Sequence, residues 1–343
     1  MDLTLSLISH RFLTNFLPVS GELVTPAVDG RPQELESAIK NLFLSSLIVV
    51  LGTSSAIAEV SFSGYGRFGL FYDEGNDDET RLDQRFRLNL DGRTETDGGV
   101  AFAARLRIQS DDKRGGSAGT AGFNAPRFTV AYSGLRLQVG NISGAFDDDE
   151  TVFYSGYEPG LTEPIAQNST FQGPIVEYDS TGKGVSGVSL LYKTDNFQIM
   201  GNYNGDHDGD TGSEFAKTYE IGAGYDFGPI SLAAAYGNQD NGSDEVWYYV
   251  LNAFGSVGDL DYSLFFGDDD VGKKTSYGIS GRYQVGAVTQ IIASFAGGGA
   301  DDLSEAFGVG VRHDLGAGVS LRGMVGQNED GDTIADMGAH FNF

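Results

Sequence analysis

The sequence predicts an all-β protein, a transmembrane antiparallel up-and-down β-barrel of sixteen strands. Apolar and polar residues alternate with a period of two from residue 59 to the C-terminus, which is the pattern of strands with one apolar face. Short and long connections alternate along the chain, and the polar face of the early strands carries arginines. A soluble barrel keeps its apolar side chains inside, whereas a membrane barrel turns them outward around a wet interior.

The composition fits this fold class and excludes several others. The 343 residues include 50 Gly, 16 Tyr and 23 Phe, which suit turns and strands better than helices. No cysteine is present, so disulfide scaffolds, thiol nucleophiles and cysteine metal sites are excluded. A formal charge of −26 argues against a nucleic-acid partner. A mean hydropathy of −0.19 excludes a helical membrane protein.

The first 58 residues are predicted to lie outside the barrel. Residues 42–51 are almost entirely apolar, Lys40 precedes them, and Ala56-Ile57-Ala58 follows, which is the layout of a secretory signal peptide over 37–58. The alternative is a buried core helix. Residues 1–36 are expected to be a leader upstream of the true translation start, which is predicted near Lys40. Without these 58 residues, the 48 acids lose five and the 22 bases lose three, which leaves a net charge of −24 on the domain 59–343.

The strands can be followed in order along the chain. In the second, Phe86 and Leu88 alternate with Arg85 and Arg87, and the others show the same period. Residues 174–181 would add a seventeenth strand, but antiparallel closure needs an even number, so they are assigned to the preceding loop. The sixteen predicted strands span 59–72, 80–92, 100–110, 127–133, 135–141, 185–194, 196–204, 217–227, 230–239, 245–255, 259–267, 275–285, 288–296, 305–315, 319–327 and 333–343.

Seven arginines share the polar parity of the first five strands. A charged face is normally a solvated surface, but the signal peptide and the aromatic C-terminus favour a wet lumen. Sixteen strands enclose an aqueous channel rather than a packed core. The seven are Arg67, Arg85, Arg87, Arg105, Arg107, Arg127 and Arg136.

Several segments resemble one known family. The segment Glu59-Val-Ser-Phe-Ser-Gly-Tyr-Gly-Arg-Phe-Gly-Leu-Phe-Tyr72, together with 85–90, 94–107 and 140–146, is similar to the general bacterial porins of the alphaproteobacterial branch. The chain also ends on Phe343 after alternating apolar residues, which resembles the signal read by the outer-membrane barrel assembly machinery. The resemblance covers essentially all of 59–343 and is loose between 147 and 218.

The resemblance implies a homotrimer of barrels in the bacterial outer membrane, in contact with its lipid. It implies that the third extracellular loop, here 141–173, folds into the lumen, and that acids on this loop face the seven arginines. The loop acids are Asp147, Asp148, Asp149, Glu150, Glu158 and Glu163. The implied function is passive diffusion of small hydrophilic solutes and ions.

The charge of −24 predicts a weak cation preference. The main alternative is a substrate-specific outer-membrane channel, which would carry stacked binding residues in its lumen. An enzyme is not expected, because His207, His313 and His340 are the only histidines after residue 58 and none has a recognisable catalytic setting. No cofactor is expected.

Two further features leave alternatives open. Asp206, Asp208 and Asp210 are a weak candidate for a loosely bound calcium ion, although the chelating glutamate of an EF-hand loop is missing; otherwise they form a hydrophilic loop. Trp247 and its tyrosine neighbours either join an interfacial aromatic girdle or pack internally.

Overall fold

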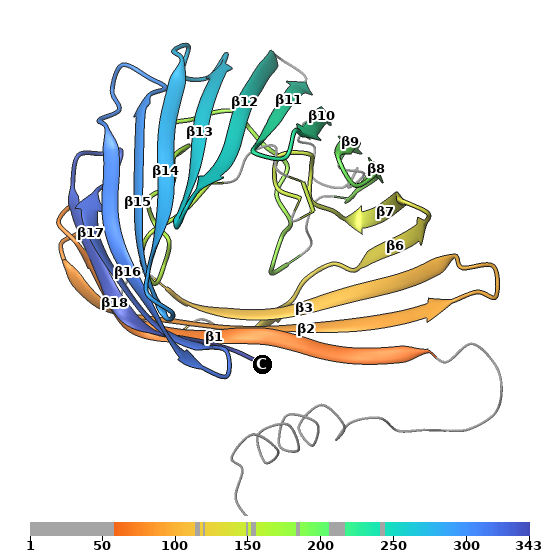
Figure 1. The fold of residues 1–343 in the computed structure, drawn as a ribbon, viewed down its shortest axis with the longest axis horizontal. Coiled ribbons are helices and arrows are strands. Elements are labelled where there is room, and N and C mark those ends of the chain that lie inside the picture. Colours follow the sequence, from red (N-terminus) through yellow and green to blue (C-terminus); the bar gives the residue numbers. More distant parts are fainter. Residues whose placement is uncertain are drawn as a thin grey trace, which may run out of the picture. The chain divides into compact units, whose positions relative to one another are not determined.

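A closed antiparallel sheet forms the structure, which is a computed structural model (Figure 1). It describes residues 58–343 except 114–116, 119–120, 149, 152–155, 183–185, 206–216 and 241–243. The predicted leader and nearly all of the predicted signal peptide therefore lie outside the described residues. Within the described residues, no helix is long and apolar enough to span a membrane.

Sixteen long strands make up the ring, as predicted. They are β1 (Glu59–Asp73), β2 (Thr80–Glu95), β3 (Ala101–Lys113), β6 (Arg127–Tyr132), β7 (Leu135–Asn141), β8 (Ser186–Lys193), β9 (Phe197–Asn204), β10 (Lys217–Asp226), β11 (Ile230–Asp240), β12 (Glu245–Val257), β13 (Leu260–Asp269), β14 (Ser276–Val285), β15 (Thr289–Gly298), β16 (Ala306–Gly316), β17 (Val319–Gln327) and β18 (Thr333–Asn342). Two pieces of two residues, β4 (Ser117–Ala118) and β5 (Gly122–Phe123), lie in the connection after β3.

The first and last strands close the ring. β1 pairs with β2 on one side and with β18 on the other, where Tyr65 lies opposite Asn342 and Asp73 opposite Ile334. Closure leaves none of the sixteen long strands in the described residues at an open sheet edge, as a membrane-spanning sheet requires. The segment 174–181 forms no strand, so its assignment to the loop is confirmed.

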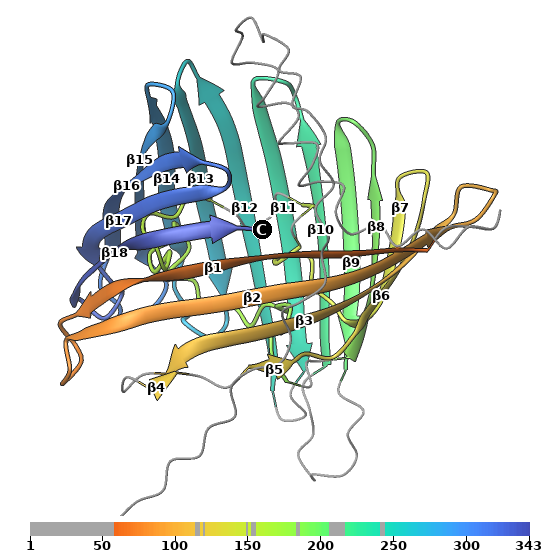
Figure 2. The same ribbon diagram turned by 90° about the horizontal axis from the view of Figure 1, so that it is seen from below.

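The two ends of the barrel differ. Tight turns join the strands at one end, as at Gly228, whose φ of 92° suits glycine. Longer connections join them at the other end (Figure 2). The N-terminal end of β1 and the C-terminal end of β18 both lie at the tight-turn side, where the backbone of Phe343 exchanges hydrogen bonds of 2.9 and 3.0 Å with Gly64.

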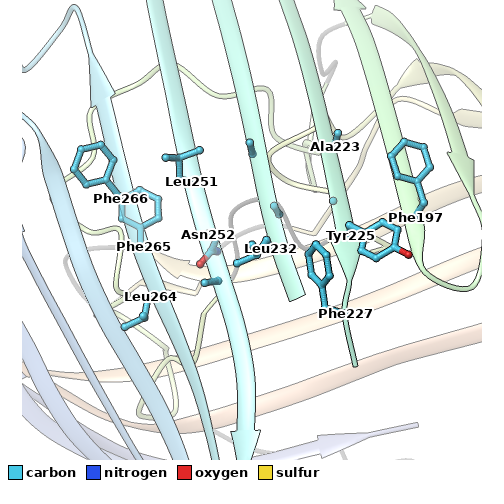
Figure 3. A pocket seen from close by; sticks show the side chains of 14 residues that line it. Phe197, Ala223, Tyr225, Phe227, Leu232, Leu251, Asn252, Leu264, Phe265 and Phe266 are labelled. Carbon is cyan, nitrogen blue, oxygen red and sulfur yellow. The ribbon is translucent and has the colours of Figure 1, made fainter. Parts of the chain in front are cut away.

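The outer wall is apolar. In β1 the side chains of Phe62, Phe68 and Leu70 are about half exposed, and in the other strands the same parity carries leucine, valine and aromatic residues. On β9 to β13 small alanines among these larger side chains leave an open apolar depression of about 600 Å³ (Figure 3). Trp247 is 37% exposed on this outer face, whereas its neighbour Tyr248 points inward and is fully buried.

The connection between β7 and β8 runs inside the ring, where Figure 1 shows it in yellow-green. Its residues Ile142, Ala145, Leu161 and Ile165 are at most 1% exposed, although a coil in an open lumen would be solvated. The loop therefore packs against the inside of the barrel wall.

Apolar side chains attach this loop to part of the wall. Phe146 and Phe171 of the loop pack with the inward-facing Met200, Tyr248 and Phe265. The alternation alone predicts an inner face that is polar throughout. The structure differs here, because the loop covers these apolar positions and keeps water away from them.

Candidate functional site in the barrel lumen

The predicted arginines occupy inward positions on β1, β2, β3, β6 and β7, which are consecutive in the ring. The register brings them together, since Arg67 lies opposite Arg85 and Arg105 opposite Arg127. Strand pairing alone therefore gathers charges that lie far apart in the sequence.

Three of these arginines form ion pairs with aspartates of the wall itself. These aspartates share the inward parity, so each side chain reaches its partner on the neighbouring strand. The pairs are Arg67–Asp83 at 2.9 Å, Arg105–Asp91 at 2.6 Å, and Arg85–Asp111.

Three further arginines gather around the returning limb of the loop. Arg107 and Arg87 both donate to the hydroxyl of Ser180, at 2.7 and 3.2 Å. The guanidinium carbons of Arg107 and Arg127 lie 4.5 and 4.7 Å from the ring centroid of Tyr178. Among the described residues none of these three arginines has a carboxylate within ion-pair distance.

The first loop acids meet the seventh arginine. Arg136 forms ion pairs with Asp148 at 2.5 Å and with Glu150 at 2.7 Å. Asp147 instead accepts a hydrogen bond of 2.8 Å from the backbone N–H of Tyr178, which ties the two limbs of the loop together. Asp149 lies outside the described residues.

The later loop acids lie toward a second basic group. Glu163 pairs with Arg322 of β17 at 2.9 Å. Glu158 is exposed to solvent, but nearby protein atoms partly desolvate its carboxylate. This desolvation, together with the negative charge of Glu163, raises the pKa of Glu158 to about 7.

The second basic group consists of Arg282, Arg312 and Arg322, which also face the lumen. Arg312 on β16 lies directly opposite Arg322, and Arg282 on β14 pairs with Asp261 at 2.6 Å. We did not predict this group from the sequence. The sequence pattern could have identified it, because each of these arginines stands at the inward, polar position of a strand whose alternate positions are mainly apolar.

A stacked pair links the two basic groups. Tyr65 of β1 and His340 of β18 stack with ring centroids 4.9 Å apart, and Arg87 lies 5.0 Å from the centroid of Tyr65. The arginine belt, defined as the inward-facing arginines of β16, β17, β1, β2, β3, β6 and β7, thus borders about half of the ring.

The loop packs against inward-facing glycines of β1, β14 and β18. A Cβ added at Gly69 or Gly338 would lie 2.2 Å from a carbonyl oxygen of the neighbouring strand, and 2.6 to 2.7 Å from the Leu161 side chain of the loop. At Gly278 it would lie 1.8 Å from the carbonyl oxygen of Gln167. These contacts are closer than any side chain allows, so the missing side chains make room for the loop.

A metal site is not indicated within the described ranges, where no three His, Asp or Glu side chains are placed to hold an ion. The calcium candidates Asp206, Asp208 and Asp210 lie outside the described residues.

Comparison with known proteins agrees with this geometry. The family model of the Gram-negative porins matches residues 45–333. The chain belongs to this porin family. It is 34% identical over 302 residues to a porin of Fuscovulum blasticum, covering 83% of this chain and all of the relative. It is 23% identical to a porin of Rhodobacter capsulatus, with the same coverage.

Solved structures show the same likeness. A triple mutant of the Rhodopseudomonas blastica porin superposes with a TM-score of 0.71 at 27% identity, and the match covers 83% of this chain and all of that one. This protein is thus an outer-membrane porin. Its relatives are channels rather than enzymes.

Proposed function

We propose that this porin lets small hydrophilic solutes and ions diffuse passively through a lumen narrowed by the loop 141–173. The observation that carries the proposal is a loop bearing carboxylates inside a ring whose inner wall bears the arginine belt. Such a pore discriminates by radius and charge rather than by specific binding.

The opposed charges would create a transverse field. Arg87, Arg107 and Arg127 keep uncompensated positive charge on one side, since the described residues offer them no ion-pair partner. Glu158 carries an exposed carboxylate on the loop. Polar solutes can reorient in such a field, whereas an apolar solute must displace oriented water. Replacing Arg87 by Gln should therefore alter ion selectivity more than replacing the ion-paired Arg105.

A weak cation preference follows from the long-loop end of the barrel. Acids are dense there, in 77–79, 301–305 and 329–332, and few bases accompany them. A mouth of one sign attracts the opposite ion. Reversal potentials in a salt gradient that showed clear anion preference would contradict this part of the proposal.

The deciding experiment is conductance of the purified protein in a planar bilayer. Stepwise ohmic currents that no sugar saturates are expected from a general pore. A substrate-specific channel is the second candidate, and the stacked pair Tyr65–His340 inside the lumen favours it. Block by a single solute at low concentration would establish that candidate, and absence of any current would refute both.

Assembly follows the family in this proposal. The protein would form a homotrimer in outer-membrane lipid, delivered by the barrel assembly machinery that recognises Phe343. Chemical cross-linking of the detergent-extracted protein should give a trimer, and a monomer only would contradict this.

A further inference from the structure

The internal loop leaves many backbone groups without partners in regular secondary structure. From 156 to 182 its described residues form only turns, bends, an isolated bridge and irregular coil. Buried backbone N–H groups nearly always find an acceptor, so acceptors must come from elsewhere. Two carboxylates of the barrel wall, Glu220 and Asp336, supply several of them.

Glu220 projects inward from β10 and is 3% exposed. Its carboxylate accepts hydrogen bonds from the backbone N–H of Ala145 at 2.8 Å and of Val176 at 2.9 Å. It also accepts one from the Tyr248 hydroxyl at 2.9 Å. Ala145 and Val176 belong to the outgoing and returning limbs of the loop, so one carboxylate fastens both.

The loop backbone approaches Glu220 closely at Gly144. The two limbs also bond directly, from the N–H of Gly144 to the carbonyl oxygen of Val176 at 2.8 Å. A Cβ at Gly144 would lie 2.0 Å from Glu220 Oε2, so the backbone reaches the carboxylate only because the residue is glycine. The ring of Tyr248, whose hydroxyl bonds the carboxylate, contacts the ring of Phe146, which follows Ala145, with centroids 5.1 Å apart.

Asp336 plays the same part on the other side of the lumen. It lies inward on β18, eight strands from β10 in the ring of sixteen, and is 5% exposed. Its carboxylate accepts hydrogen bonds from the N–H of Leu161 at 2.8 Å and of Thr162 at 2.7 Å, and from the Thr162 hydroxyl at 2.8 Å. The loop is therefore tied at two opposite points of the wall.

We infer that Glu220 and Asp336 are positioning residues that hold the loop across the lumen and thereby set the pore size. The inference rests on the proposed diffusion function. Because both carboxylates are buried against backbone donors, they take no direct part in attracting ions. Their loss should change which solutes pass by size, and should leave ion selectivity nearly unchanged.

The test compares Glu220→Ala with two matched variants. Tyr248→Phe removes a hydrogen bond to the same carboxylate, but the donor lies on the wall, so the loop should stay in place. Glu158→Gln removes an exposed loop carboxylate that the wall does not bind. Each protein is examined for single-channel conductance, for reversal potential in a salt gradient, and for swelling of vesicles in sugars of increasing size.

Glu220→Ala should admit larger sugars, raise the mean conductance and add current fluctuations at an unchanged reversal potential. Tyr248→Phe should match the wild type, and Glu158→Gln should shift the reversal potential only. If Glu220→Ala does not assemble, Asp336→Asn tests the other tie with the same expectation.

Assembly of each variant is checked by the heat-dependent shift of its mobility in detergent gels. Folded Glu220→Ala and Asp336→Asn barrels with wild-type size exclusion and steady currents would overturn the inference. Absence of current in the wild type would instead refute the proposed function.

Discussion

Adding one methyl group to the wall under the loop should narrow the pore. Gly278 of β14 faces inward, and the carbonyl oxygen of Gln167 lies over it. The side chain of Gln167 is also bound to the wall: its Nε2 donates to the Ser263 hydroxyl at 2.8 Å, and its Oε1 accepts from the Ser280 hydroxyl at 3.0 Å. The substitution Gly278→Ala places a Cβ in this contact.

The required displacement follows from the geometry. The Cβ added at position 278 would begin 1.8 Å from the Gln167 oxygen, and ordinary contact begins at 3.4 Å, so the two must separate by about 1.6 Å. Overpacking of this kind costs about 1–3 kcal/mol. The loop is irregular coil, whereas the strand is hydrogen-bonded on both sides. The same Cβ would also lie 2.7 Å from the carbonyl oxygen of Phe295 on β15, so the wall has little room to relieve the overlap. The loop should therefore move away from the wall, toward the lumen.

Single-channel conductance and vesicle swelling measure the outcome. We expect Gly278→Ala to conduct less than the wild type and to exclude smaller sugars. Gly323→Ala is the control, since the three atoms nearest to its added Cβ, the closest being the carbonyl oxygen of Asp336 at 3.0 Å, all belong to β18 and not to the loop. A Gly278→Ala pore that is as wide as the wild type, or equal reductions in both variants, would refute the reasoning.

Three other changes have defined outcomes. Arg136→Met leaves the buried Asp148 without its cation and should lower the free energy of unfolding in urea by about 3–5 kcal/mol; adding Asp148→Asn should restore part of it, and an unchanged single variant would contradict the pairing. Cation preference should rise as the pH is raised through about 7, because Glu158 then loses its proton; reversal potentials measure this, and Glu158→Gln should abolish the dependence. Phe343→Ala should reduce the amount of barrel assembled in cells, measured by heat-modifiable mobility of outer-membrane extracts. The control is Phe86→Ala, which removes the ring that stacks on Phe343 with centroids 5.7 Å apart. It should assemble in larger amounts than Phe343→Ala, and equal yields of the two variants would contradict a terminal signal.

The barrel was predictable because a strand's faces are set by local alternation. The period of two located all sixteen long strands, and the need for even closure placed 174–181 correctly in the loop. The inward parity of Arg105 was equally visible. Its partner was not predicted, because pairing with Asp91 depends on the register between β2 and β3 rather than on either strand alone.

The loop was the limit of prediction. It has no periodicity, since its backbone is held by tertiary contacts with strands distant in sequence. Glu220 stands between Tyr219 and Ile221 at the polar parity and there resembles any lumen-facing charge. Only the folded structure shows that it meets Ala145, from which 75 residues separate it. For the same reason the loop acids could be assigned to a segment but not to individual partners.

The distribution of charge within the pore matters more than the net charge of the chain. Arg67 and Arg105 are compensated by wall aspartates a few ångströms away, so each pair contributes mainly a short dipole at the wall. Glu220 and Asp336 direct their charge to backbone donors and are shielded from the lumen. The field at the constriction must then come mainly from the few groups without such partners. A net charge of −24 therefore describes the barrel as a whole and its acidic mouth, whereas discrimination at the constriction depends on which side chains the register and the loop leave unpaired.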